Sequence, residues 1–180
     1  KIHDVVGTGF RLPGPQQSVY TMAANAILRL ITQFDINPAE VRFLALGTES
    51  STDNSAGTII IKGMVDNALR QLGKEPLSRN CEVPEFKHAC LGGIYALKNA
   101  LRFLHTDGHD AKAIVVCSDI ALYATGSSGE PTQGAGAVAM LLEANPAIAS
   151  IDLQHAGSAS DYRGVDFRKP IQYRNGDGRE

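Results

Sequence analysis

Apolar residues recur at helical spacing in three segments of the chain. The first segment predicts an amphipathic helix over residues 16–34, after an irregular opening rich in glycine and proline. The second predicts a helix over residues 56–72, which Gly73 ends. The third starts at a glycine-bearing turn at residues 89–93 and runs to about residue 104. We therefore expect three helices of ordinary length.

Shorter apolar runs between and after these helices have the length of strands. Residues 41–46 and 113–117 are almost entirely apolar, as expected of strands that are buried on both faces. Residues 134–142 predict a strand of small residues, and a further strand over residues 148–155 suggests an antiparallel hairpin. Strands that alternate with helices and end in a hairpin indicate an α/β fold with a mixed sheet.

Cys90 lies where a short extended run near Phe86 passes into the third predicted helix. A thiol at a helix N-terminus lies beside unpaired backbone N–H groups and the positive end of the helix dipole, which stabilise the thiolate. Cys90 is therefore a candidate nucleophile. The alternative is a small packing residue, because free cysteine is among the most buried residue types. The local sequence alone does not decide between the two.

Glu49 and Asp53 follow the strand that is predicted over residues 41–46. Carboxylates at the C-terminal end of a buried strand lie where α/β proteins place their sites. The alternative for these two is a solvated loop and a helix cap. The glycine-rich loop at residues 125–136 contains neither of the common phosphate-binding motifs, so it gives little support to phosphate binding.

Composition and charge exclude several classes of protein. The 17 Lys and Arg against 19 Asp and Glu leave a net charge of −2, which offers no general field to attract nucleic acid or anionic membranes. No apolar run approaches the length of a membrane span, and the start at Lys1 carries no signal-peptide core, so a cytoplasmic location is expected. The 3 cysteines match no zinc or redox spacing, and His105 and His109 match no metal-ligand spacing, so we expect reduced thiols and no metal.

Five short motifs lie in order along the chain. They are Gly47-Thr48-Glu49 with Asp53 after it, Ala89-Cys90-x-Gly92-Gly93, Asp119-Ile120-Ala121 with Tyr123-Ala124-Thr125-Gly126, Pro131-Thr132-x-Gly134-x-Gly136-Ala137-Val138, and Asp166-Phe167-x-Lys169-Pro170. Each motif is weak alone. Together, over residues 21–170, they resemble the 3-hydroxy-3-methylglutaryl-CoA synthases, which are thiolase-fold condensing enzymes.

The resemblance implies a partial thiolase-like α/β fold, mostly its N-terminal half, in which residues 1–180 form a single incomplete domain. The first strand of that fold would precede Lys1, and the family's catalytic histidine would lie well beyond Pro170. None of the 5 histidines stands in the corresponding motif. We therefore expect an internal piece of a longer synthase that is inactive by itself.

The resemblance also implies an aldol-type condensation. Cys90 would accept an acetyl group from a thioester. Glu49 would then remove a proton from the acetyl methyl group, so that the enolate attacks the ketone carbon of an acetoacetyl thioester and water releases a 3-hydroxy-3-methylglutaryl thioester. A positioned and partly desolvated carboxylate suits this proton transfer. The turn beside Cys90 is expected to offer an N–H donor to the enolate.

Six further residues match family positions in or near the site: Asp53, Asp119, Asp166, Thr132, Asn99 and Phe167. The resemblance places the three aspartates in hydrogen-bond networks and gives the threonine a role in holding the substrate. It places the asparagine on the nucleophile helix and the phenylalanine near the acetoacetyl group. For each of the six, a supporting structural role is the alternative to substrate contact. No cofactor is implied beyond the coenzyme A or phosphopantetheine thioesters that serve as substrates, and no metal.

Several departures from the family pattern bear on the acceptor. Leu91 stands where the family often has tyrosine, His88 stands where asparagine is common, and both the Glu49-to-Cys90 interval and the glycine-rich loop are longer. These departures fit the branch found beside polyketide synthases, which installs β-branches on ketones bound to acyl carrier protein. The carrier thus stays open between coenzyme A, as in isoprenoid-precursor synthesis, and acyl carrier protein. The family also implies a homodimer at full length.

Two alternatives to this activity stay open. A ketoacyl synthase III-like condensing enzyme shares the fold and the cysteine, but it has no glutamate at the position of Glu49. A non-catalytic thiolase-fold member would keep the fold and dock carrier proteins. The basic residues between positions 163 and 174 fit a phosphate or an acidic carrier protein, and fit a solvated loop equally well.

Overall fold

The computed structural model describes residues 9–127 and 129–163. By its internal contacts the chain divides into two units, Lys1–Ser150 and Ile151–Glu180. Every helix and strand of the described residues belongs to the first unit. No helix in the described part of the chain has the length and apolar character needed to cross a membrane.

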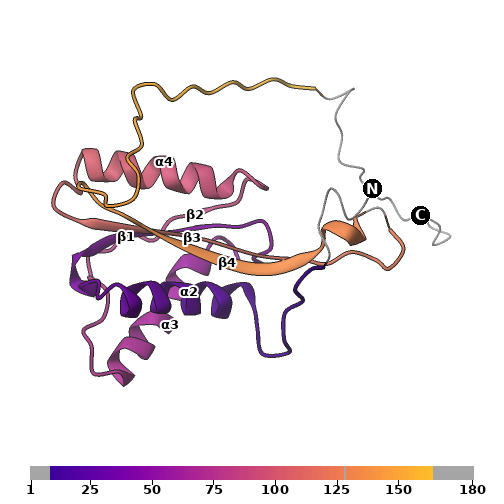
Figure 1. Ribbon diagram of the computed structural model, residues 1–180, viewed down its shortest axis with the longest axis horizontal. Coiled ribbons are helices and arrows are strands. Elements are labelled where there is room, and N and C mark those ends of the chain that lie inside the picture. Colours follow the sequence, from indigo (N-terminus) through magenta and orange to yellow (C-terminus); the bar gives the residue numbers. More distant parts are fainter. Residues whose placement is uncertain (1–8, 128, 164–180) are drawn as a thin grey trace. The chain divides into compact units, whose positions relative to one another are not determined.

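The first unit is built on a four-stranded mixed sheet with the order β2-β1-β3-β4 (Figure 1). Its strands are β1 (Val41–Gly47), β2 (Glu85–Phe86), β3 (Lys112–Ala121) and β4 (Gly134–Leu142). Strand β1 pairs in parallel with both β2 and β3, while β4 runs antiparallel to β3. The mixed α/β sheet expected from the sequence is therefore confirmed.

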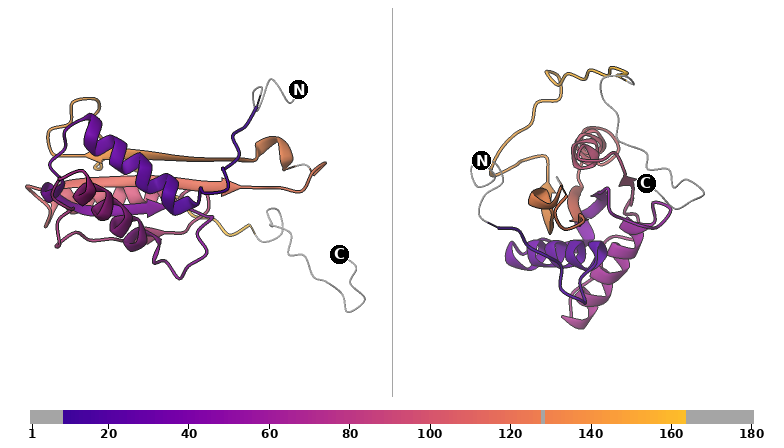
Figure 2. Two further views of the ribbon diagram at one scale, coloured as in Figure 1. Left: turned by 90° about the horizontal axis from the view of Figure 1, so that it is seen from below. Right: turned by 90° about the vertical axis from the view of Figure 1, so that its right-hand side faces the viewer.

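Helices cover both faces of this sheet. Helices α2 (Val19–Gln33) and α3 (Gly57–Gln71) lie on one face, and α4 (Gly92–His105) lies on the other (Figures 1 and 2). Two short 3₁₀ turns, η1 (Pro38–Glu40) and η2 (Glu130–Thr132), precede β1 and β4. All three predicted helices are present, and their ends differ from the prediction by no more than a few residues.

Local hydrogen bonds explain where α2 begins. Ser18 is its N-cap, and its side chain accepts a hydrogen bond from the backbone N–H of Thr21. The Thr21 side chain in turn accepts from the Ser18 backbone N–H, which completes a capping box. The helix therefore starts at Val19 and not at residue 16. Just beyond it, Asp35 has a φ of +47°, a left-handed conformation that ends the helix.

Two apolar clusters, one on each face of the sheet, form the core. Leu44 of β1 packs with Ile27 of α2 and Ile61 of α3, and all three are fully buried. On the other face, Phe43 of β1 packs with Phe103 of α4, and their ring centroids lie 5.1 Å apart. Burying a side chain of this size contributes about 1.5–3 kcal/mol. Because β1 contributes side chains to both clusters, all of its residues except Arg42 are apolar and buried.

The predicted strand over residues 148–155 is wrong. These residues form no strand, and the antiparallel partner of β4 is β3, with a register that runs from Ala113 opposite Leu142 to Ala121 opposite Gly134. Ile148 is 98% exposed. A strand is stabilised by packing its apolar side chains against neighbours, and Ile148 has no such packing.

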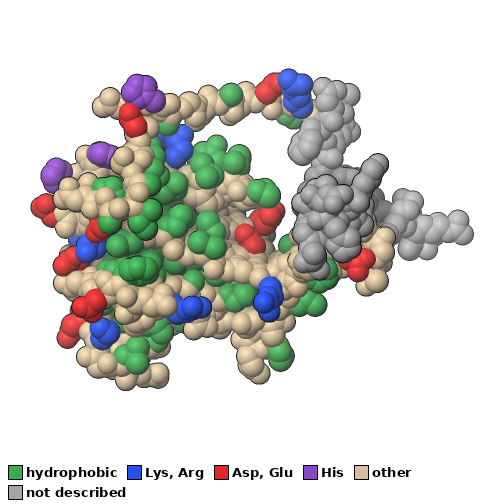
Figure 3. Space-filling model, in the orientation of Figure 1, with side chains coloured by type: hydrophobic (Ala, Val, Ile, Leu, Met, Phe, Trp, Pro, Cys, Tyr) green, Lys and Arg blue, Asp and Glu red, His purple; other side chains and the backbone are tan. Residues whose placement is uncertain are grey.

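The outer side of α4 keeps apolar side chains in contact with solvent. Leu91, Ile94 and Tyr95 are 50%, 53% and 39% exposed. In contrast, Ala96 is fully buried, and Leu97 and Leu101 pack partly against the core cluster below the helix. The space-filling view shows further exposed apolar side chains on the face that is turned towards the viewer (Figure 3).

Candidate active site around Cys90

Cys90 lies in the turn between β2 and α4, two residues before the first residue of the helix. The preceding residue, Ala89, has a φ of +44°, a left-handed conformation that is uncommon for a residue with a Cβ. The backbone N–H groups of Leu91 and Gly92 donate to the carbonyl oxygens of His88 and Ala89. This tight, strained turn leaves the Cys90 side chain exposed.

Three glycines allow the turn to lie against the end of β1. A Cβ on Gly47 would lie 2.4 Å from the backbone nitrogen of Gly93, and a Cβ on Gly92 would lie 2.5 Å from the carbonyl oxygen of Phe86. A Cβ on Gly93 would lie 2.4 Å from Sγ of Cys117. Such contacts are too short for any other residue. The glycines of two sequence motifs thus bring the Gly47-Thr48-Glu49 segment and the Cys90 turn together.

A cavity of about 220 Å³ opens beside Cys90. Its polar lining comes from Cys90, Cys117 and Asp119, while Ile94, Leu97 and Met140 supply apolar side chains. Cys117 reaches the cavity because β3 pairs with β1 in a register that places it opposite Gly47. Cys117 ends an apolar run, which by itself suggests a core residue, and only the pairing of β3 with β1 indicates a position next to Cys90.

Glu49 is the carboxylate that the structure places next to Cys90. The two residues are 41 positions apart in the chain, yet Sγ of Cys90 donates a hydrogen bond to Oε1 of Glu49 over 3.7 Å. Glu49 follows β1 with only Thr48 between them, and Cys90 lies two residues before the start of α4. The geometry therefore brings a carboxylate to a thiol that lines a largely apolar cavity.

Asp119 holds the start of the loop that carries Glu49. Its Oδ1 accepts hydrogen bonds from Oγ1 of Thr48 at 2.9 Å, from the backbone nitrogen of Glu49 at 2.8 Å and from the hydroxyl of Ser50 at 2.7 Å. The Ser50 backbone nitrogen also donates to it, at 3.1 Å. One carboxylate oxygen thus fixes three consecutive residues, and Asp119 also lines the cavity. The sequence placed it just beyond the strand, but it lies within β3.

Asp53 lies in the same loop but belongs to a different set of contacts. It accepts hydrogen bonds from the Tyr20 hydroxyl and from the backbone N–H of Ala56, the N-cap residue of α3. The Tyr20 hydrogen bond is the main cause that holds the pKa of Asp53 below its usual value. Burial and the same contact raise the pKa of Tyr20. Asp53 fixes the loop before α3 and does not line the cavity.

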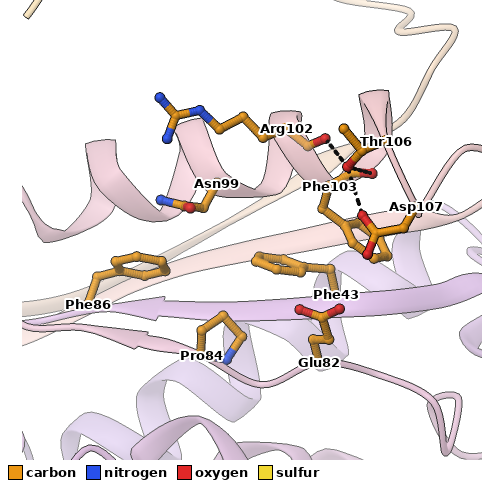
Figure 4. A pocket seen from close by; sticks show the side chains of 9 residues that line it. All are labelled: Phe43, Glu82, Pro84, Phe86, Asn99, Arg102, Phe103, Thr106 and Asp107. Carbon is orange, nitrogen blue, oxygen red and sulfur yellow. Dashed lines mark hydrogen bonds between the residues drawn. The ribbon is translucent and has the colours of Figure 1, made fainter.

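Asn99 and Thr132 lie outside the Cys90 cavity. Nδ2 of Asn99 donates to the carbonyl oxygen of Tyr95 at 2.8 Å. Asn99 faces another pocket, of about 280 Å³, together with Phe43, Phe86 and Arg102 (Figure 4). The Thr132 hydroxyl donates to the carbonyl oxygen of Gly129 in the loop between β3 and β4.

The two remaining predicted site residues, Asp166 and Phe167, lie outside the described residues. Within the part of the chain that is described, no group of three or more His, Cys, Asp and Glu side chains has an arrangement that would hold a metal ion.

The three cysteines differ in their surroundings. Burial raises the pKa of Cys81 to about 12. Burial, and then the charge of Asp119, raise the pKa of Cys117. Cys90 is the exposed thiol of the three.

We expect iodoacetamide at pH 7–8 to alkylate Cys90 before Cys81 and Cys117, because only the thiolate reacts and the raised pKa values of these two partly buried thiols keep them protonated at that pH. Peptide mapping by mass spectrometry over time measures the three rates. As the pH rises, modification of Cys117 should appear before that of Cys81. Faster labelling of Cys81 or Cys117 than of Cys90 at pH 7 would contradict the assignment of Cys90 as the nucleophile.

Comparisons with known proteins identify the family. Residues 7–147 match the family model for the N-terminal part of hydroxymethylglutaryl-coenzyme A synthase. A hydroxymethylglutaryl-CoA synthase from Enterococcus faecalis is 34% identical over 171 residues, which cover 94% of this chain and 41% of that protein.

Two solved structures agree with this match. MvaS in complex with 3-hydroxy-3-methylglutaryl coenzyme A is similar with a TM-score of 0.70 and 33% identity, covering 79% of this chain and 32% of that one. PksG, an HMG-CoA synthase from Bacillus subtilis, has a TM-score of 0.62 and 31% identity, covering 76% of this chain and 32% of its own. This chain thus spans about a third to two fifths of the relatives it matches. Fold, site geometry and these matches agree, and the chain belongs to the hydroxymethylglutaryl-CoA synthase family.

Proposed function

We propose that the protein containing this chain is a condensing acyltransferase that joins an acetyl group to a β-ketoacyl thioester, giving a 3-hydroxy-3-methylglutaryl thioester. The observation that carries the proposal is the hydrogen bond, 3.7 Å long, between Glu49 and Cys90, which lines a cavity. A nucleophile and a carboxylate base side by side are the two groups that this chemistry requires.

The first step is the transfer of the acetyl group. The Cys90 thiolate attacks the carbonyl carbon of an acetyl thioester, a new C–S bond forms, and the carrier leaves as its thiol. Little energy separates two thioesters, so the step needs a nucleophile and no strong driving force. The exposed position of Cys90 in its tight turn leaves the sulfur accessible to a thioester.

The second step forms the carbon–carbon bond. The Glu49 carboxylate removes a proton from the methyl group of acetyl-Cys90, and the resulting enolate carbon attacks the ketone carbon of an acetoacetyl thioester. That ketone oxygen takes up a proton and becomes the 3-hydroxyl group. Water then cleaves the Cys90 thioester, which leaves a free carboxylate on the product and returns the thiol. Asp119 supports this step by fixing the backbone on both sides of Glu49.

The enolate needs hydrogen-bond donors, and the turn beside Cys90 supplies fewer than the sequence suggests. The N–H groups of Leu91 and Gly92 already donate to carbonyl oxygens within the turn. Donors for the enolate oxygen are therefore expected from groups other than these two N–H groups.

Coenzyme A is the carrier that the comparisons favour. MvaS was solved with 3-hydroxy-3-methylglutaryl coenzyme A, and a further HMG-CoA synthase, with a TM-score of 0.56 and 36% identity over 71% of this chain, was solved with CoA. Acyl carrier protein is the second candidate for the acceptor. It is favoured by His88 and Leu91, which stand where the family often has asparagine and tyrosine.

Transfer of a radiolabelled acetyl group tests the proposal. The full-length protein is incubated with acetyl-CoA or with acetyl-loaded acyl carrier protein, quenched in acid, digested and mapped. We expect stoichiometric label on the peptide that contains Cys90, and none in Cys90→Ala. Product formation with acetoacetyl groups on each carrier then identifies the acceptor. An absence of label, or label that persists in Cys90→Ala, would rule out this function and favour a non-catalytic member of the family.

A further inference from the structure

The loop that carries Glu49 is held from two sides. Asp119 of β3 binds its beginning, at Thr48, Glu49 and Ser50. A second set of contacts comes from the segment at β2, immediately before the Cys90 turn, and binds the loop at Ser51 and at the start of α3.

Glu85 supplies the central contact of this second set. Its Oε1 accepts a hydrogen bond from the Ser51 hydroxyl, and its Oε2 accepts one from the backbone nitrogen of Gly57 at 2.7 Å. Gly57 is the first residue of α3, where a negative charge also interacts favourably with the helix dipole. One carboxylate thus connects the loop after Glu49 to the helix that follows it.

Lys87 also binds Ser51, at its backbone carbonyl group. Its Nζ donates to the carbonyl oxygen of Ser51 at 2.6 Å. Ser51 therefore gives its hydroxyl hydrogen to Glu85 and accepts at its carbonyl from Lys87, although it is only 6% exposed. Hydrogen bonds to charged groups in such partly buried positions are the stronger ones in a protein.

The residues at the start of α3 leave room for the Glu85 carboxylate and add a further hydrogen bond. A Cβ on Gly57 would lie 2.7 Å from Oε2 of Glu85, so only glycine lets the carboxylate reach the helix terminus. Next to it, the buried Thr58 donates its hydroxyl to the carbonyl oxygen of Pro84 at 2.8 Å. Residues 84–87 are thus joined to residues 51–58 by four hydrogen bonds.

We infer that Glu85, assisted by Lys87, is a positioning residue for Glu49. Glu85 and Lys87 precede Cys90 by five and three residues, so the segment that carries the nucleophile also holds the loop that carries the base. The Ser51 contacts, two residues after Glu49, therefore keep the Glu49 carboxylate within reach of Cys90 and of an acetyl group on it. This inference rests on the proposed function, because it assigns Glu85 a part in the proton-transfer step only.

A purely structural role for Glu85 would have a different signature. Capping α3 alone would stabilise the fold, and losing it would reduce every activity of the site by the same factor. Loss of positioning would instead slow the step that needs Glu49 and spare the step that needs only Cys90, because a misplacement of about 1 Å can slow a reaction step about a hundredfold.

The experiment compares these two steps in the full-length protein. One measurement is the rate of Cys90 acetylation from acetyl-CoA. The other is the rate at which the methyl protons of acetyl-Cys90 exchange with deuterated water, per acetylated site. The variants are Glu85→Gln, which replaces one of the two acceptor oxygens, and Ser51→Ala, which removes the contact but leaves the cap of α3 in place. Glu82→Gln is the matched control, since this exposed carboxylate lies in the same segment but faces the pocket of Figure 4.

We expect Glu85→Gln and Ser51→Ala to slow methyl exchange about tenfold or more while acetylation stays within about twofold, and Glu82→Gln to change neither rate. Equal losses in both steps, or no loss in exchange for Ser51→Ala, would overturn the positioning role. Failure of the proposed function would give a different result. In that case the parent protein, without any substitution, would take up no acetyl group on Cys90 and would show no methyl exchange.

Discussion

Glu49→Ala is expected to accumulate acetyl-Cys90 and to form the condensation product far more slowly than the parent protein. The Cys90 thiolate can attack a thioester without help from Glu49, but the methyl protons of the bound acetyl group need a base. A positioned general base contributes about 10²–10⁴-fold to such a step, so the loss in condensation should lie in that range. The acetylation rate should change far less.

Two assays on the full-length protein measure the effect. Acid-stable label on Cys90 reports acetylation, and release of the 3-hydroxy-3-methylglutaryl product reports condensation. Glu82→Gln again serves as the control, because it removes an exposed carboxylate that does not line the cavity.

The hydrogen bond from Cys90 to Glu49 makes a second role conceivable, in which Glu49 takes the thiol proton before acetylation. Loss of acetylation in Glu49→Ala, with an unchanged thermal unfolding transition, would establish that role and refute the one proposed here. Acetylation with normal condensation would exclude Glu49 as the base altogether.

Gly47→Ala is expected to destabilise the protein by roughly 3 kcal/mol. The new Cβ would lie 2.4 Å from the Gly93 nitrogen and 2.7 Å from the Gly92 carbonyl carbon, and these are backbone atoms that cannot rotate away. The end of β1 and the start of α4 must then separate, which also pulls Glu49 away from Cys90. Urea unfolding followed by circular dichroism measures the change in the free energy of unfolding.

Gly63→Ala is the matched control for this substitution. Gly63 is exposed in the middle of α3, and a Cβ there meets no atom within 4 Å. Alanine should therefore stabilise the protein by about 0.5–1 kcal/mol, because it restricts the unfolded chain. A Gly47→Ala variant as stable as the parent would show that β1 and α4 do not approach as closely as the structure describes.

The sequence alone determined the parts of the molecule that depend on local periodicity. The 3.6-residue spacing of apolar residues predicted α2, α3 and α4, because each helix buries one face along its whole length against the sheet. The apolar run over residues 41–46 predicted a strand buried on both faces, which is how β1 lies between two clusters. A turn that carries Cys90 into a helix was also predicted, because Gly92 and Gly93 lie two and three residues after it.

The local sequence pattern gave wrong predictions where contacts between segments far apart in the chain determine the structure. Residues 148–155 have the composition of a strand, but they pair with no strand of the sheet, and Ile148 stays exposed. Asn99 lies on the nucleophile helix as expected, yet its place along the helix turns it to the pocket of Figure 4 and away from the Cys90 cavity.

The arrangement of the site was decided only by the tertiary structure. Family resemblance named Cys90 and Glu49, but their contact across 41 residues depends on the parallel register that sets Leu46 opposite Glu85 and Gly47 opposite Phe86 and Cys117. The two carboxylates that hold the Glu49 loop, Asp119 and Glu85, come from different strands on either side of β1. Hydrogen bonds between such distant segments leave no periodic trace in the sequence, because they depend on the pairing of strands and not on the spacing of residues along one of them.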